Sequence, residues 1–216
     1  MKRTIFMLVL CIIVCFTSCG LLGTEEKNNT NVMVQSRSYG REARTVNYAF
    51  GDSIYYLYNY LIEDQVSDIY FYILTLDDSG EWEKTLIRKC SDIPQKSAFA
   101  YDIACEDGIV YIGVPGENSE KMSGPVLVDQ LYDKDVFYQC LHQSNIVETK
   151  RGEIIPLDIY WRDDRIPYSL VEKHFEEKTN YKGLEVVVCN IEQLYCNPHK
   201  LKELNMEPFA LAVEFR

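Results

Sequence analysis

The chain has 216 residues, 47% of them hydrophobic, which is enough for one domain with a sizeable core or for two small ones. Acidic residues outnumber basic residues by 33 to 22, so the net charge is −11. This balance argues against nucleic acid as a partner, because binding to phosphates depends on Lys and Arg. It also argues against a protein that lies flat on anionic lipid.

The first 18 residues have the three-part layout of a secretory signal peptide. Lys2 and Arg3 give a positive start, and Thr4–Phe16 is an apolar run of 13 residues. A membrane-spanning helix needs about 20 apolar residues, so this run is too short to be a comfortable anchor. Removal of this segment leaves 198 residues with a net charge of −13.

The end of this segment, Phe16-Thr17-Ser18-Cys19, resembles the lipobox of bacterial lipoproteins, in which a large apolar residue and two small ones precede a cysteine. Phe16 stands where Leu is commonest. The resemblance implies cleavage before Cys19 and acylation of Cys19. Several acyl chains anchor a protein stably, so we expect it on the cell membrane or outer membrane, facing outside the cytoplasm. The alternative is a hydrophobic N-terminal helix in which Cys19 is incidental.

Residues 19–44 are polar, with the Asn-rich stretch Lys27–Asn31 and no sustained period. We therefore predict a flexible tether here. A β-rich domain is predicted over residues 45–150, because aromatic and β-branched runs alternate with Asp/Gly clusters. Its predicted strands are Thr45–Phe50, Ser53–Ile62, Asp68–Leu76, Glu81–Lys89, Phe99–Cys105, Ile109–Val114, Val126–Leu131, Val136–His142 and Ile146–Lys150.

Residues 151–216 change in character and alternate between strands and helices. A helix is predicted over Ser169–Lys178, with Ser169 as its N-cap and Glu172 three residues on. The other predicted elements are the strands Ile154–Trp161, Leu184–Cys189 and Phe209–Phe215 and the helix Pro198–Leu204. The predicted fold class is therefore α+β, predominantly antiparallel β (meander or sandwich-like), with a small C-terminal α/β unit packed on the same domain.

Part of the β-rich region resembles a blade of a kelch-type propeller. The resemblance rests on Gly51–Tyr55, the aromatic strand Ile69–Tyr72, Trp82 and Asp107–Tyr111. The paired glycines of kelch repeats are absent, and a propeller needs at least about four blades. We therefore expect an antiparallel meander here and not a propeller.

Tyrosine is abundant, with 16 residues. Tyr56, Tyr58 and Tyr60 fall on one face of a predicted strand, because side chains alternate along a strand. Together with Trp82 and Trp161 they are the candidate ligand-contact residues, since such rings stack on sugars or form partner interfaces. The alternative is that the tyrosines are cross-strand packing pairs that stabilise a sheet.

Five cysteines follow Cys19, and this odd number leaves at least one outside any internal disulfide. Cys189 with Cys196, or Cys90 with Cys105, could form a bridge, and buried free thiols explain them equally well.

Cys140 and His142 share one face of a predicted strand, and Cys189, Cys196 and His199 form a loose thiol/imidazole group. Structural zinc sites usually show two short-spaced ligand pairs. Only fragments of that pattern are present, so the sequence predicts no metal and no cofactor.

Asp163-Asp164, near Trp161 and between Arg162 and Arg165, is a pair of carboxylates of the kind that glycoside hydrolysis uses. Adjacent residues seldom reach the required separation, so a charged turn is the simpler interpretation. We therefore predict a non-enzymatic, membrane-tethered module that binds a protein or glycan. The alternatives are an envelope glycan hydrolase that uses Asp163 or Asp164 with His174, and a purely structural envelope lipoprotein.

Overall fold

The computed structural model describes residues 31–36, 56–62, 66–104, 109–113, 126–127, 138–144, 146–181 and 184–216. The predicted signal segment, Cys19, and the predicted strand Thr45–Phe50 lie outside the described residues. Among the helices in these ranges, none is both long enough and apolar enough to cross a membrane.

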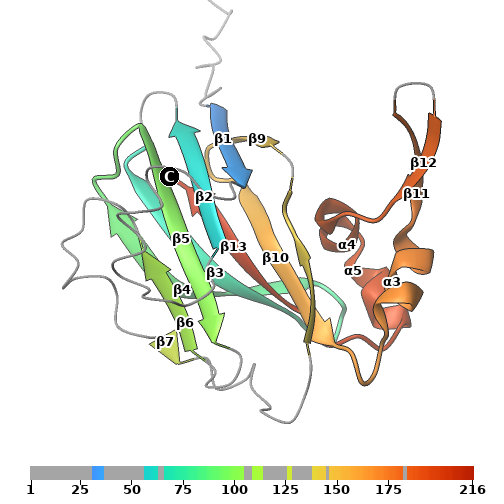
Figure 1. The fold of residues 1–216 in the computed structure, drawn as a ribbon. Coiled ribbons are helices and arrows are strands. Elements are labelled where there is room, and N and C mark those ends of the chain that lie inside the picture. The colour runs from blue at the N-terminus through green and yellow to red at the C-terminus, as the bar shows by residue number, and fades with distance from the viewer. Residues whose placement is uncertain are drawn as a thin grey trace, which may run out of the picture.

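Strands dominate the described part of the chain (Figure 1). They are β1 (Asn31–Ser36), β2 (Tyr56–Ile62), β3 (Asp68–Leu76), β4 (Trp82–Ser91), β5 (Lys96–Ala104), β6 (Ile109–Gly113), β7 (Val126–Leu127), β8 (Tyr138–His142), β9 (Ile146–Lys150), β10 (Ile154–Arg162), β11 (Glu177–Tyr181), β12 (Leu184–Val188) and β13 (Phe209–Phe215). The helices are α3 (Tyr168–Phe175), α4 (Ile191–Cys196) and α5 (Pro198–Glu203).

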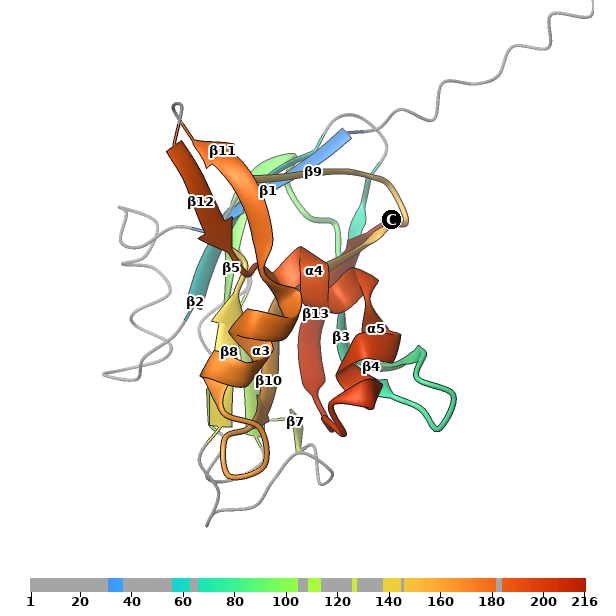
Figure 2. The same ribbon diagram turned by 90° about the vertical axis from the view of Figure 1, so that its right-hand side faces the viewer.

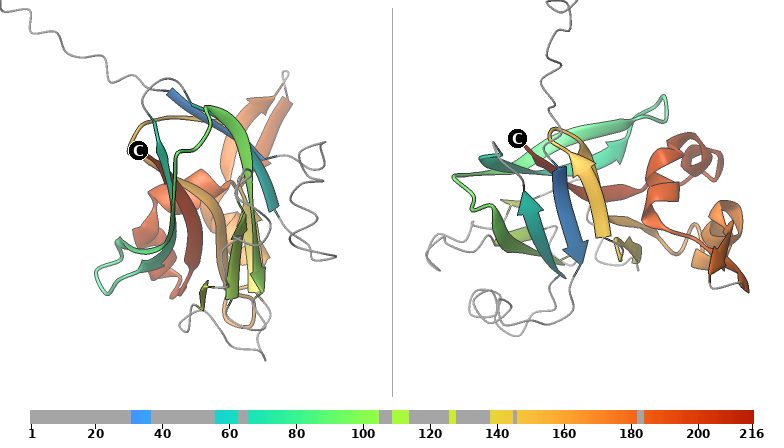
Figure 3. Two further views of the ribbon diagram at one scale, coloured as in Figure 1. Left: turned by 90° about the vertical axis from the view of Figure 1, so that its left-hand side faces the viewer. Right: turned by 90° about the horizontal axis from the view of Figure 1, so that it is seen from above.

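In the described residues, two large antiparallel sheets face each other (Figure 3). The first sheet has the strand order β7-β6-β5-β2-β1-β9, and the second has the order β4-β3-β13-β10-β8. The predicted fold class is confirmed, and the arrangement is sandwich-like. The meander expected between residues 51 and 114 is wrong, because β2, β5 and β6 belong to the first sheet while β3 and β4 belong to the second.

Strand β1 lies inside the predicted tether, residues 19–44, so that prediction is wrong for residues 31–36. The strand pairs with β2 on one side and with β9 on the other. Val32 and Val34 are fully buried in the core between the sheets. Two alternate valines in a polar stretch are a weak signal in the sequence, but the ladders on both sides fix this strand.

The last strand, β13, occupies the middle of the second sheet. It pairs with β3 and β10, and all seven of its residues are buried. Side chains of β13 alternate between two cores, with Leu211 and Val213 between the sheets and Ala210 and Ala212 on the outer side. The C-terminal segment therefore supplies two central strands of the sandwich, β10 and β13.

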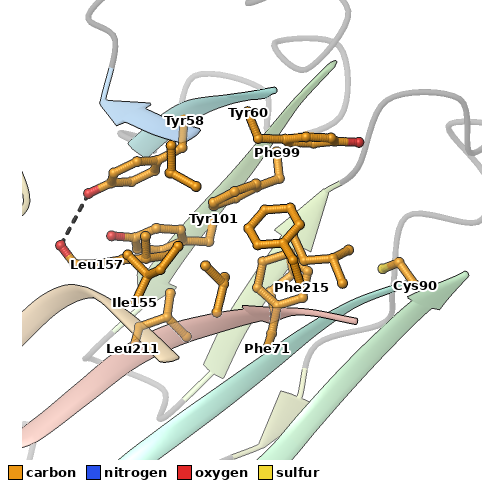
Figure 4. Close-up of a cluster of buried hydrophobic side chains, with 14 of the residues drawn as sticks. Tyr58, Tyr60, Phe71, Cys90, Phe99, Tyr101, Ile155, Leu157, Leu211 and Phe215 are labelled. Atoms are coloured by element: carbon orange, nitrogen blue, oxygen red, sulfur yellow. Dashed lines mark hydrogen bonds between the residues drawn. The ribbon is translucent and has the colours of Figure 1, made fainter. Parts of the chain in front are cut away.

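The core between the sheets is rich in aromatic rings (Figure 4). Tyr58 stacks on Phe99 and Tyr101, with ring centroids 5.5 and 5.9 Å apart. From the second sheet, Phe71 meets the Phe99 ring edge-on at 5.3 Å. The Tyr58 hydroxyl donates a hydrogen bond of 3.2 Å to the Leu157 carbonyl, which joins the two sheets (Figure 4). Such offset and edge-on pairs stabilise a core beyond their buried area.

The helices cover part of the outer face of the second sheet (Figure 2). Val171 and Phe175 of α3, Leu194 of α4 and Leu201 of α5 pack into this second core. Helix α4 was not predicted from the sequence. It begins with a capping box in which Asn190 and Gln193 satisfy each other's backbone N–H groups.

The predicted start and end of the first helix are wrong. Helix α3 begins at Tyr168 after Pro167, and no side chain caps its N-terminus. Proline fixes a backbone angle that suits a helix start, so Ser169 is not needed as the cap. The helix ends at Phe175, and residues 177–181 form β11, which pairs with β12 in a two-stranded ladder.

We predict that Leu211→Ala lowers the free energy of unfolding by about 2–5 kcal/mol, because it removes a side chain that is fully buried and leaves a cavity. Denaturant unfolding of the two variants against the unmodified protein measures this. Leu86→Ala is the matched control, since Leu86 is 51% exposed and its loss should change stability by no more than about 0.5 kcal/mol. Equal effects would mean that β13 does not hold the position described.

Candidate functional site

The three candidate tyrosines of β2 do share one face, and that face points into the core. Tyr58 and Tyr60 are 1% and 2% exposed, so neither ring offers a surface on which a ligand could stack. Tyr56 is partly exposed, and its ring lies 4.3 Å from the His142 ring, centroid to centroid. The structure thus uses two of these tyrosines for packing and brings the third to a polar cluster.

The two tryptophans lie apart from the tyrosine row. Trp161 is 1% exposed and its Nε1 donates to the Ile166 carbonyl at 2.9 Å. Trp82 is partly buried, stacks on Tyr195, and donates its Nε1 proton to the Tyr195 carbonyl. Trp82 therefore fixes α4, and Trp161 fixes the turn before α3, against the second sheet.

The carboxylates of the hydrolase alternative do not converge. Asp164 pairs with Arg162, while Asp163 accepts a hydrogen bond from Gln139. A hollow beside Trp161 has an empty volume of about 190 Å³ that includes open solvent, and neither aspartate lines it. Ligand sites commonly span 300–1,000 Å³. His174 is exposed on α3 and meets the Phe175 ring edge-on.

Cys189 and Cys196 carry free thiols, so the disulfide considered for this pair is absent. His199, the third member of that group, pairs with Glu81 at 3.5 Å. Cys90 is buried in the core between the sheets, and Cys105 lies outside the described residues. The thiol/imidazole group at the C-terminal end therefore does not assemble a binding site.

A second group, Cys140, His142 and Asp158, does come together. The Cys140 Sγ lies 3.5 Å from His142 Nδ1, and the same Nδ1 lies 2.5 Å from Asp158 Oδ1. One ligand atom from each residue falls within 4.8 Å of the other two. We call these three residues the Cys–His–Asp cluster.

Strand register builds this cluster. Asp158 stands opposite His142, and Tyr160 stands opposite Cys140, in the antiparallel ladder of β10 with β8. Residues two apart on a strand share a face, so all four side chains point to the same side. Strand β8 ends the order of the second sheet in the described residues (Figure 2). The His142 side chain is 39% exposed there.

A bulge in β10 sets the direction of Asp158. The register with β13 shifts between Pro156 and Asp158, so Leu157 and Asp158 are consecutive residues that both turn toward the space between the sheets. Bulges commonly re-aim a side chain in this way, and proline is tolerated at them. Without the shift, Asp158 would face the helices.

The electrostatics of the Cys–His–Asp cluster are dominated by burial. Asp158 is 0% exposed, and burial raises its carboxyl pKa well above the usual range, while a hydrogen bond from the Tyr160 hydroxyl to Oδ2, 3.2 Å long, acts the other way. Burial also lowers the pKa of His142. The same place therefore disfavours a lone negative charge on Asp158 and a lone positive charge on His142.

A different polar surface lies on the outer face of the second sheet. Tyr70 and Tyr72 stack with ring centroids 6.4 Å apart. Lys84 lies over the Tyr72 ring at 5.1 Å, and Lys89 and Arg216 lie over the Tyr70 ring at 5.2 and 4.6 Å. We call these five residues the tyrosine–cation face. Cation–ring contacts of this kind hold charged groups at fixed positions.

Two acidic side chains border the tyrosine–cation face. Glu214 pairs with Arg216 at 2.6 Å, and Asp68 pairs with Lys89 at 3.0 Å. Burial raises the pKa of Glu214, but hydrogen bonds from Arg216 and Tyr72 outweigh it and leave this pKa below the usual value. The face therefore carries three cations against two carboxylates, in a chain with an acidic balance overall.

Comparison with protein-family models, with curated proteins and with solved structures finds no match to this chain.

The two free thiols near the C-terminus should differ in reactivity. Burial raises the pKa of Cys189 to about 11, whereas Cys196 is exposed. At pH 8 only about a thousandth of a thiol with that pKa is thiolate, which is the reactive form. We predict that iodoacetamide modifies Cys196 well before Cys189, as followed by peptide mass spectrometry. Reaction of Cys189 first, or protection of both as a disulfide, would contradict this arrangement.

Proposed function

We propose that this chain is a lipid-anchored lipoprotein of the bacterial cell envelope whose β-sandwich is a non-enzymatic binding module for a protein or glycan. The proposal of a lipid anchor rests on Phe16-Thr17-Ser18-Cys19 and on the short apolar run that precedes it. With acylated Cys19 in the bilayer, the sandwich would face outside the cytoplasm.

The spacing between the anchor and the sandwich supports a domain held near the membrane. Eleven residues separate Cys19 from Asn31, the first residue of β1. A chain of this length spans at most about 40 Å. The proposed binding module would therefore meet partners that lie within the envelope close to the anchoring membrane.

The observation that carries the binding role is the tyrosine–cation face. Tyr70 is partly exposed on a strand whose neighbouring side chains, Ile69 and Phe71, are fully buried. A rigid sheet thus presents an aromatic ring with two cations over it, Lys89 and Arg216. This combination suits sugar rings or protein segments that carry acidic groups. The acidic balance of the rest of the chain makes this face the best place for such a partner.

The lipid anchor gives the first prediction. Cys19→Ala should abolish incorporation of labelled palmitate in the bacterial host and move the protein out of the membrane fraction, because the acylated thiol is lost. Cys196→Ser, which removes an exposed thiol on α4, is the control and should keep both properties. Continued labelling of the Cys19→Ala variant would rule out this anchor.

The binding role gives the second prediction. The full-length chain in detergent, applied to a glycan array and to envelope extracts for pull-down, should retain ligands that carry acidic groups. Tyr70→Ala and Lys89→Ala should each weaken the retained interaction at least about fivefold, a loss of about 1 kcal/mol. Lys173→Ala, on the exposed side of α3, should leave it unchanged. No retained ligand in either assay, or equal weakening by all three variants, would contradict the proposal.

A further inference from the structure

The Cys–His–Asp cluster is not explained by packing or by the proposed binding role. It joins one sulfur, one imidazole nitrogen and one carboxylate oxygen from two neighbouring strands. His142 is partly exposed, while Asp158 is fully buried at the inner side of the cluster. The group is therefore open to solvent on one side and anchored in the sandwich on the other.

The buried carboxylate of Asp158 is the main reason to expect a bound cation at this cluster. Its contacts are His142 Nδ1 at 2.5 Å and the Tyr160 hydroxyl at 3.2 Å, and no Lys or Arg of the described residues pairs with it. A buried carboxylate is costly unless a cation or a metal compensates its charge. The fold keeps this carboxylate beside a thiol and an imidazole, which are the protein groups that bind transition metals.

A nucleophilic Cys–His–Asp triad does not fit this geometry. In such a triad the nucleophile contacts one nitrogen of the imidazole and the carboxylate orients the other nitrogen. Here Cys140 Sγ and Asp158 Oδ1 both lie beside Nδ1. Three ligand atoms that converge on one point describe a coordination sphere and not a proton relay.

The sulfur–nitrogen separation fits a zinc ion, and the nitrogen–oxygen separation must widen to do so. Zn–S and Zn–N bonds of about 2.3 and 2.05 Å at a tetrahedral angle place sulfur and nitrogen about 3.6 Å apart. The observed distance from Cys140 Sγ to His142 Nδ1 is 3.5 Å. The nitrogen and carboxylate oxygen of such a site are about 3.4 Å apart, so His142 and Asp158 must separate by about 0.9 Å from their present 2.5 Å contact.

We propose that Cys140, His142 and Asp158 bind a borderline divalent cation of the Zn²⁺ type through Sγ, Nδ1 and Oδ1, with a fourth position open to water or to a ligand. The cation replaces the hydrogen-bonded proton between Nδ1 and Oδ1, and this proton is released to solvent. The Cys140 thiol gives its proton to solvent when the sulfur binds, and the imidazole of His142 carries its proton on Nε2.

Tyr160 acts as the supporting residue of this site. Its hydroxyl donates to Asp158 Oδ2 and so leaves Oδ1 directed at the cluster. Partners that orient a metal-binding carboxylate commonly change metal affinity 10–100-fold when they are removed. Tyr56, whose ring lies against His142, closes the side that faces the first sheet.

Metal binding by the full-length chain, purified in detergent with a non-chelating reductant, tests the site. Equilibrium dialysis against Zn²⁺ alone, with metal analysis, should give one ion per chain. Cys140→Ser and His142→Asn should each weaken binding at least 100-fold. Cys196→Ser and His199→Asn, which remove an exposed thiol and an exposed imidazole elsewhere, are the matched controls and should bind as the unmodified protein does.

Cobalt(II) identifies the sulfur ligand directly. The unmodified protein should show a thiolate-to-cobalt charge-transfer band in the near ultraviolet, and Cys140→Ser should lose it while Cys196→Ser keeps it. Asp158→Asn, with circular dichroism to check the fold, should weaken binding like the other two ligand variants. If Asp158→Asn does not fold, zinc binding by Cys140→Ser and His142→Asn still tests the site, because Cys140 is half-buried and His142 is partly exposed. Absence of binding, or binding that the Cys140 and His142 variants leave intact, would overturn the site.

Discussion

The pairing of β13 with both β3 and β10 is the constraint on which the rest of the structure depends. Those two ladders place Leu211 and Val213 between the sheets and Ala210 and Ala212 under the helices, so one strand serves both hydrophobic cores. A strand buried on both faces tolerates no slip in register, because a shift by one residue would exchange the two sets. The positions of β10, and through it of β8 and the Cys–His–Asp cluster, follow from this one strand.

Much of the fold could be predicted from local sequence signals, because most strands here are aromatic or β-branched runs between turn residues. The bounds predicted for β3, β9 and β13 agree with the structure. The elements that were missed lack such signals. Strand β1 offers only two alternate valines, and β11 (EKTNY) is a polar segment that becomes a strand because β12 pairs with it. The assignment of strands to two different sheets is a long-range property that no local pattern contains.

Only two of the three residues of the Cys–His–Asp cluster could be predicted from the sequence to lie together. The spacing of Cys140 and His142 indicated a shared face, and the structure agrees. Asp158 could not be found in this way, since its place depends on the register of β10 with β8 and on the shift after Pro156. An acidic residue two positions after a proline, inside the largely apolar strand IIPLDIYWR, is the one sequence signal that points to Asp158. Tyr58 and Tyr60 were predicted as ligand-contact residues but are buried. Tyrosine rings suit a hydrophobic core as well as they suit a ligand surface, so the sequence pattern does not separate the two.

The position of β1 has a mechanical consequence for a protein held by its N-terminal end. Any pull between the membrane and a bound partner would enter the sandwich at Asn31 and run along β1, which is bonded to β2 on one side and β9 on the other. A load along a strand stretches all of its cross-strand hydrogen bonds together, whereas a load at right angles opens them one at a time. In the proposed lipid-anchored protein, the anchor would therefore lead into a strand that is hydrogen-bonded on both sides.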